Sequence, residues 1–218
     1  MKLRKLIIPF TLYVLFVLFH KSITINTLNL GSSWTFSFTA PYILSLIAIF
    51  LFAYQFNSVF KQKLNSFSKI ISIVSFFVLG GIAFAVNPIY EGDFSNTYDE
   101  IVITGTKEVV PEGLTMLALP GCPHCYGRIG TLNRLLKRNP GLKIQIIFQA
   151  NAESVIAEYE SKLLSNISVL VYENDKMLNQ LGIRKYPAFL YNNNEGLLHK
   201  WKNDDFGNPA LDFIEAKQ

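Results

Sequence analysis

Three long apolar runs fill the first 90 residues of the chain. They read LIIPFTLYVLFVLF from Leu6 to Phe19, PYILSLIAIFLFAYQF from Pro41 to Phe56, and IISIVSFFVLGGIAFAV from Ile70 to Val86. A helix needs about 20 predominantly apolar residues to span a bilayer, and neutral flanking residues lengthen the shorter runs. The pattern predicts an all-α membrane region, residues 1–90, with three transmembrane helices at about 6–25, 38–56 and 70–87.

The first run also has the features of a signal peptide, because the basic start MKLRK precedes it. No small-residue cleavage site follows, however, since the next residues are His20, Lys21 and Ser22. We therefore expect an uncleaved first span.

A polar linker, residues 91–108, follows the membrane region and contains a first strand pattern at 101–104. After the linker, strand patterns at 115–119, 142–150 and 167–172 alternate with helix patterns at 122–138, 154–164, 175–181 and 209–216. The pattern also predicts a hairpin, 188–192 with 197–201, before the last helix. The order predicts a small α/β domain, residues 109–218, in which helices flank a mixed sheet.

Charge is divided sharply along the chain. No Asp or Glu precedes Glu91, whereas seven Lys or Arg residues do. Three of them lie in MKLRK, one in the first predicted loop and three in the second, and such a bias places the N-terminus and the second loop in the cytoplasm. The α/β domain then lies outside the cell. The pI near 9.0 reflects this topology, and no basic stripe with interleaved aromatics indicates nucleic-acid binding.

The chain has two cysteines, Cys122 and Cys125, three residues apart. Zinc sites usually have four ligands, and a disulfide that closes so short a loop stabilises little. The spacing favours redox chemistry: Cys122 follows a strand and begins a helix, where backbone N–H groups favour a thiolate. Pro123 suits the first helical position, and His124 adds a polar or positive neighbour. Cys125 is then placed to resolve a mixed disulfide.

The segment LALPGCPHC and the helix expected over 122–138 resemble the thioredoxin-fold family. The motif C-P-H-C is typical of bacterial periplasmic disulfide oxidases. The segment LGIRKYPAFLYNNNEGLLHKW, 181–201, is similar to the thioredoxin segment around its cis-proline. The resemblance implies that Pro187 is cis, that Tyr186 precedes it, and that both bind substrate opposite the cysteines. Cis bonds occur almost only before proline, in agreement with this implication.

The chain also departs from that family. Met116 stands where thioredoxins have a buried Asp, Gly121 replaces the usual Trp, and Gly130 takes the place of the mid-helix proline. An extra helix and strand between Ala150 and Leu181 resemble the redoxin branch, which includes tethered proteins of cytochrome c maturation. The dipeptide Pro123–His124 between the cysteines resembles disulfide oxidases, whereas the rest of the domain resembles redoxins. The two resemblances imply different partners.

Three further side chains allow a functional and a structural interpretation. His199 is a candidate second base, although a surface or edge-strand histidine is the simpler interpretation. Tyr126 and Phe148 are candidates for a substrate groove, although core packing is the default for each.

The resulting hypothesis is a membrane-anchored, extracytoplasmic thiol–disulfide oxidoreductase. Its expected partners are thiols and disulfides of exported proteins, the lipid bilayer and a separate redox protein, because the predicted spans hold no cysteine. We expect no cofactor and no metal. The alternatives are a dedicated reductant for cytochrome c maturation and a Cu(I)-handling protein that uses the two thiolates.

Overall fold

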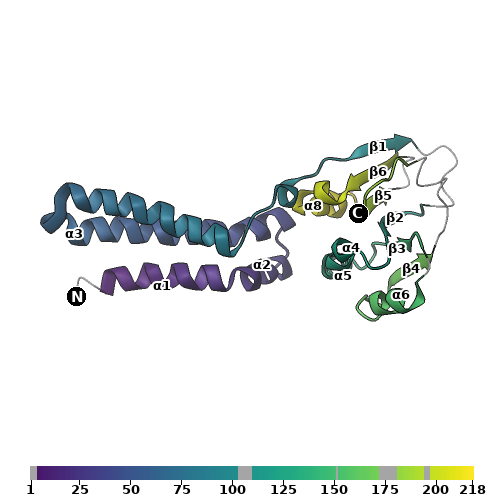
Figure 1. Cartoon of the computed structure of the whole chain (residues 1–218), viewed down its shortest axis with the longest axis horizontal. Helices are drawn as coiled ribbons and strands as arrows, with labels where there is room; N and C mark the ends of the chain where they lie inside the picture. The colour runs from purple at the N-terminus through teal and green to yellow at the C-terminus, as the bar shows by residue number, and fades with distance from the viewer. Residues whose placement is uncertain (1–3, 103–109, 151, 172–180, 194–196) are drawn as a thin grey trace. The chain divides into compact units, whose positions relative to one another are not determined.

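The computed structural model describes residues 4–102, 110–150, 152–171, 181–193 and 197–218, with side chains except at 60–68. The chain forms two compact units, Met1–Tyr90 and Glu91–Gln218 (Figure 1). Each unit has its own elements and its own core. The expected helix at 175–181 and the tip of the expected hairpin fall largely outside the described residues.

The first unit consists of α1 (Arg4–Leu18), α2 (His20–Asn29) and α3 (Trp34–Val86). The first predicted span is bent by 73° at a break between α1 and α2. The sequence of α2, HKSITINTLN, is largely polar, and its threonine hydroxyls donate to carbonyls one turn back, a bond that often bends helices. Within α3, Trp34–Val59 and Lys69–Val86 are each long and apolar enough to cross a membrane, and the bent pair is a third candidate if it counts as one span.

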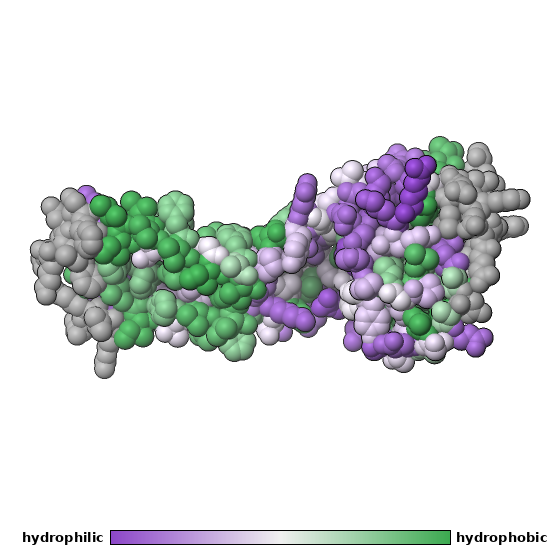
Figure 2. Space-filling model, viewed as in Figure 1, coloured by the Kyte–Doolittle hydropathy of each residue, from purple (hydrophilic) through white to green (hydrophobic). Residues whose placement is uncertain are grey.

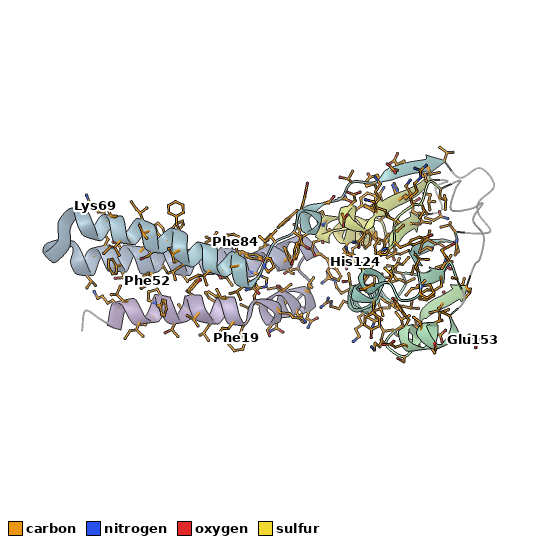
Figure 3. All side chains as sticks on the ribbon, viewed as in Figure 1. Phe19, Phe52, Lys69, Phe84, His124 and Glu153 are labelled. Atoms are coloured by element: carbon orange, nitrogen blue, oxygen red, sulfur yellow. The ribbon has the colours of Figure 1, made fainter. Side chains whose placement is uncertain are left out.

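Helix α3 folds back on itself. The hydroxyl of Tyr42 donates to the carbonyl of Asn87 at 3.1 Å although 45 residues separate them, a distance of about 65 Å along a straight helix. The ring of Tyr42 also stacks on Phe84 at 5.6 Å. Figure 1 shows the two antiparallel arms, and Figure 3 labels Phe52 on one arm and Phe84 on the other.

Many large apolar side chains of this unit point outward. Phe77 is 71% exposed, Ile8 64% and Phe50 63%. Figure 2 shows the hydrophobic surface along these helices and a mainly hydrophilic surface on the other unit. So much exposed apolar surface is characteristic of contact with lipid or with another protein rather than with water.

The second unit is built on a six-stranded sheet in the order β1-β6-β5-β2-β3-β4. Its strands are β1 (Asp99–Val102), β2 (Gly113–Ala118), β3 (Ile144–Phe148), β4 (Ile167–Val171), β5 (Ala188–Asn192) and β6 (Leu197–Lys202). Strands β2, β3 and β4 are parallel, while β5, β6 and β1 add antiparallel partners. Every residue of β2, β3 and β5 is buried, which marks them as central strands.

The helices of this unit are α4 (Pro123–Gly127), α5 (Ile129–Arg138), α6 (Glu153–Glu160) and α8 (Asn208–Ala216), with 3-10 turns η1 (Glu91–Phe94) and η2 (Asn203–Asp205). Helix α5 buries the apolar stripe that the sequence predicts, from Ile129 to Leu136. An ion pair of 2.8 Å between Arg138 and Glu215 joins α5 to α8. The mixed sheet flanked by helices confirms the α/β domain that the sequence predicts.

The segment expected to be a linker carries η1 and strand β1, and β1 overlaps the strand pattern expected at 101–104. Its pairing with β6 was not expected. Because β1 pairs with β6, β6 is not an edge strand. His199 on β6 is therefore only 5% exposed, among the rings of Tyr98, Trp201 and Phe213. The expectation of a surface or edge-strand histidine was wrong, because the strand that covers it comes from the predicted linker.

Candidate redox site

The two cysteines lie where β2 passes into α4. A turn after Ala118, with Gly121 at a φ of 76°, brings the chain to Cys122 at the N-cap of α4, and Pro123 follows in the first turn. The Cys122 sulfur accepts a hydrogen bond from the backbone N–H of Cys125 at 3.3 Å. Both thiols are free in this structure.

The environments of the two sulfurs differ. Cys122 is partly exposed, whereas Cys125 is wholly buried. Burial, helped by the hydrogen bond with Cys122, raises the pKa of the Cys125 thiol to about 12. Because the thiolate is the nucleophile, Cys122 is the sulfur able to meet an external partner, and Cys125 stays protonated until a reaction brings it into use.

The family's buried carboxylate has no counterpart at Met116, whose side chain is fully buried on β2. A phenol lies beside the cysteines instead. The hydroxyl of Tyr159, on α6, donates to the carbonyl of Cys122 at 3.1 Å. Burial first, and then negative charge on Cys125 and Cys122, raises the pKa of Tyr159 to about 12, so it acts as a neutral hydrogen-bond donor.

Tyr159 was not among the residues that the sequence singled out. The available signal was the spacing of Ile156 and Tyr159, which puts both on the buried face of α6. The ring of Tyr159 contacts Phe148 at 5.0 Å and Tyr126 at 5.2 Å, both edge to face. Phe148 is wholly buried, so the core interpretation holds for it.

Tyr126 lies at the surface beside the pair. Its hydroxyl donates to Glu158 at 3.2 Å, and the ammonium of Lys162 lies 4.3 Å from the centre of its ring. The same ammonium contacts Glu158 at 3.1 Å. Tyr126 is therefore held in a small charged cluster with Glu158 and Lys162. These contacts engage the side chain that the sequence offered as a candidate for a substrate groove.

The helix after the cysteines is interrupted, contrary to the single helix expected over 122–138. Helix α4 ends at Gly127 and α5 starts at Ile129, since the N–H of Arg128 bonds three residues back, to Cys125, at 3.1 Å. The guanidinium of Arg128 donates to the carbonyl and the side-chain oxygen of Asn203, at 2.9 and 3.1 Å. This anchor between α4 and η2 joins residues 75 apart and could not be predicted from local pattern.

The Tyr186–Pro187 peptide bond is cis, as the resemblance implied. Ala188 begins β5 and pairs with Leu117 near the end of β2, so Pro187 and the turn leading to Cys122 lie at the same edge of the sheet. Tyr186 is half-buried and packs against the core cluster that contains Leu117 and Ala188. Its ring therefore supports the sheet, and its expected role in substrate binding stays a prediction.

His124 lies on α4 between the two cysteines with its side chain exposed (Figure 3). It makes no hydrogen bond to either sulfur among the interactions of the described residues. Its expected effect on the thiolate therefore stays a prediction.

No protein-family profile and no curated protein matches this chain. Two solved structures are similar to part of it. One is a secreted Mycobacterium tuberculosis disulfide oxidoreductase homologous to E. coli DsbE, with 17% identity over 48% of this chain and 78% of that one, and a TM-score of 0.40. The other is M. tuberculosis DsbF in mixed oxidised and reduced forms, with 13% identity over 59% and 97%, and a TM-score of 0.41.

Proposed function

We propose that this chain is a membrane-anchored thiol–disulfide oxidoreductase that exchanges a dithiol for a disulfide with exported proteins. The observation that carries the proposal is the asymmetric cysteine pair: a partly exposed Cys122 sulfur at a helix start and a buried Cys125 thiol one turn away. Metal-binding or purely structural pairs have no need of one accessible and one protected sulfur.

The exchange proceeds in two balanced steps. The Cys122 thiolate attacks one sulfur of a partner disulfide, forming a mixed disulfide and releasing the other partner sulfur as a thiolate. Cys125 then loses its proton to solvent or to that leaving thiolate, attacks the Cys122 sulfur, and releases the second partner thiol. Two electrons pass to the partner, and the reverse sequence oxidises a partner dithiol.

The assay uses the full chain in detergent micelles, reduced and mixed with insulin. We expect the native chain to reduce insulin, Cys122→Ser to be inactive, and Cys125→Ser to accumulate a mixed disulfide. Insulin reduction that persists in Cys122→Ser would overturn the proposal. The reduction potential of the same preparation separates an oxidase from a dedicated reductant, since a reductant has the more negative value.

The location is also part of the proposal. The bias of Lys and Arg toward MKLRK and the second loop supports a cytoplasmic N-terminus and an outward α/β domain. A membrane-impermeant maleimide applied to intact cells tests it, because Cys122 is the accessible one of only two cysteines. Labelling of the native chain but not of Cys122→Ser supports an outward domain, and labelling that requires permeabilised cells contradicts it.

A further inference from the structure

A basic hollow lies on the second unit beside the cis-proline. It has a volume of about 240 Å³, and its lining includes Ile183, Arg184, Lys185, Ala188, Lys200 and Lys202. Ile183 and Ala188 give it an apolar floor and belong to the buried core of the sheet. Cationic side chains from two separate segments, the one before β5 and strand β6, form its rim.

Most of this positive charge is not neutralised within the described part of the chain. Lys200 is paired, since its ammonium contacts Asp99 at 2.9 Å and donates to the carbonyl of Leu181 at 3.0 Å. Arg184, Lys185 and Lys202 are exposed and form no ion pair of 4 Å or less among the described residues. Lys202 is still attracted to Asp99, whose pKa it helps to lower after the larger effect of Lys200, so Arg184 and Lys185 are the rim cations farthest from compensation. Like charges gathered around an apolar floor repel one another, and a bound anion relieves that repulsion.

The hollow lies near the end of the sheet at which Pro187 precedes β5 and the turn after β2 leads to Cys122. Arg184 and Lys185 directly precede Tyr186 and Pro187 in the chain, and Lys202 pairs with Ala188 in the register of β5 and β6. A partner segment that brings a sulfur to Cys122 alongside the cis-proline would therefore pass this rim with its flanking residues.

We infer that the basic hollow selects partners whose reactive cysteine is flanked by Asp or Glu side chains. The inference rests on the proposed exchange reaction and adds the partner class to it. Rim charges act mainly on association, so the effect belongs to the rate of mixed-disulfide formation and weakens with salt.

The test compares two disulfide peptides that differ only in flanking residues, Asp/Glu or Lys, with the reduced full chain in a neutral detergent. We expect the native chain to reduce the acidic peptide about tenfold faster at low salt, within the range of electrostatic steering. The variant Arg184→Gln/Lys185→Gln/Lys202→Gln should bring the ratio near one, as should about 0.5 M salt. A matched control, Lys137→Gln/Lys143→Gln/Lys217→Gln, removes three cations elsewhere on the unit and should keep the preference.

A small uncharged disulfide, bis(2-hydroxyethyl) disulfide, distinguishes failure of the exchange reaction from failure of the basic hollow to select acidic partners. If the native chain does not reduce it, the exchange reaction itself is wrong. Suppose that the native chain, the rim variant and the control variant all reduce the small disulfide equally. The basic hollow does not select partners if the native chain then reduces the acidic and the basic peptide at equal rates. The same conclusion follows if the control variant loses the preference as much as the rim variant does. A preference that the rim variant abolishes, with the small disulfide unaffected, supports the inference.

Discussion

The hydroxyl of Tyr159 bonds to the main-chain carbonyl of Cys122 at 3.1 Å, across 37 residues of chain. Tyr159 belongs to the extra helix between β3 and β4, so this helix holds the backbone of the accessible cysteine. The N-cap residue of α4 thus has its N–H, sulfur and carbonyl all engaged: the N–H donates to Leu119 at 3.3 Å, and the sulfur accepts from Cys125. Such bonds restrict where the Cys122 sulfur can point.

Removing that hydroxyl in Tyr159→Phe should destabilise the reduced unit while keeping the ring contacts. The Cys122 carbonyl keeps its bond from the N–H of Tyr126 at 3.1 Å, so the variant loses one of two hydrogen bonds at this oxygen. This loss should cost about 0.5–1.5 kcal/mol, which corresponds to a fall of about 2–6 °C in Tm for a unit of this size. Thermal unfolding of the reduced full chain, followed by near-ultraviolet circular dichroism, measures it.

Tyr126→Phe is the matched control. It removes the same atom, but the lost bond goes to the exposed carboxylate of Glu158, so we expect a change below about 0.5 kcal/mol. Equal losses in the two variants would contradict the special place given to the Tyr159 hydroxyl.

Alkylation should distinguish the two thiols at neutral pH. Because burial raises the pKa of Cys125 to about 12, its thiolate fraction near pH 7.5 is at least about a hundredfold below that of an ordinary thiol. Iodoacetamide and mass spectrometry should find modification at Cys122 first and at Cys125 only after denaturation. Comparable rates in the folded chain would show that Cys125 is not protected.

The same burial predicts a loss of stability in alkali. The pKa of Cys125 is raised in the folded state to about 12, so the folded chain holds this proton more tightly than the unfolded chain, whose thiol titrates at about 8.5. The stabilisation is complete below about pH 8.5 and is lost as pH rises toward 12. Reduced native chain should therefore lose stability relative to Cys125→Ser over that window.

Tyr159 contributes to the comparison in the same direction. Burial, the first cause that raises its pKa to about 12, is present in both proteins, and Cys125→Ser removes only the smaller contribution of the Cys125 charge. Urea unfolding of the two proteins at several values between pH 7 and 11 gives the difference. A difference that stays constant across the window would mean that Cys125 titrates normally.

Much of the second unit could be predicted because its signals are local. The apolar run at Ile144–Phe148 and the stripe of α5 each mark a buried face, and C-P-H-C with the later Y-P marks the reacting edge. Periodicity and short motifs suffice for elements of this kind.

The features that escaped prediction depend on contacts between distant segments. The bond from Arg128 to Asn203 accompanies the break between α4 and α5, and Tyr159 reaches Cys122 from the extra helix. Strand β1 pairs with β6 across about 100 residues, in the register of Asp99 with Lys200. No local pattern in a single sequence encodes pairings between segments so far apart. The burial of His199 depends on the pairing of β1 with β6, so it could not be predicted from the sequence.

The start of the second unit packs closely against Gly207. A Cβ at Gly207 would collide with the carbonyl oxygen of Gly92 and lie 2.8 Å from that of Ser95, to which the Gly207 N–H donates at 3.1 Å. Gly207→Ala should therefore cost about 1–3 kcal/mol through overpacking against backbone. Gly130→Ala, in open space on α5, should instead stabilise by about 0.5–1 kcal/mol through helix propensity. Urea unfolding of both variants decides: if Gly207→Ala is as stable as the native chain, η1 does not pack on Gly207, and residues 91–98 behave as the simple linker that the sequence suggested.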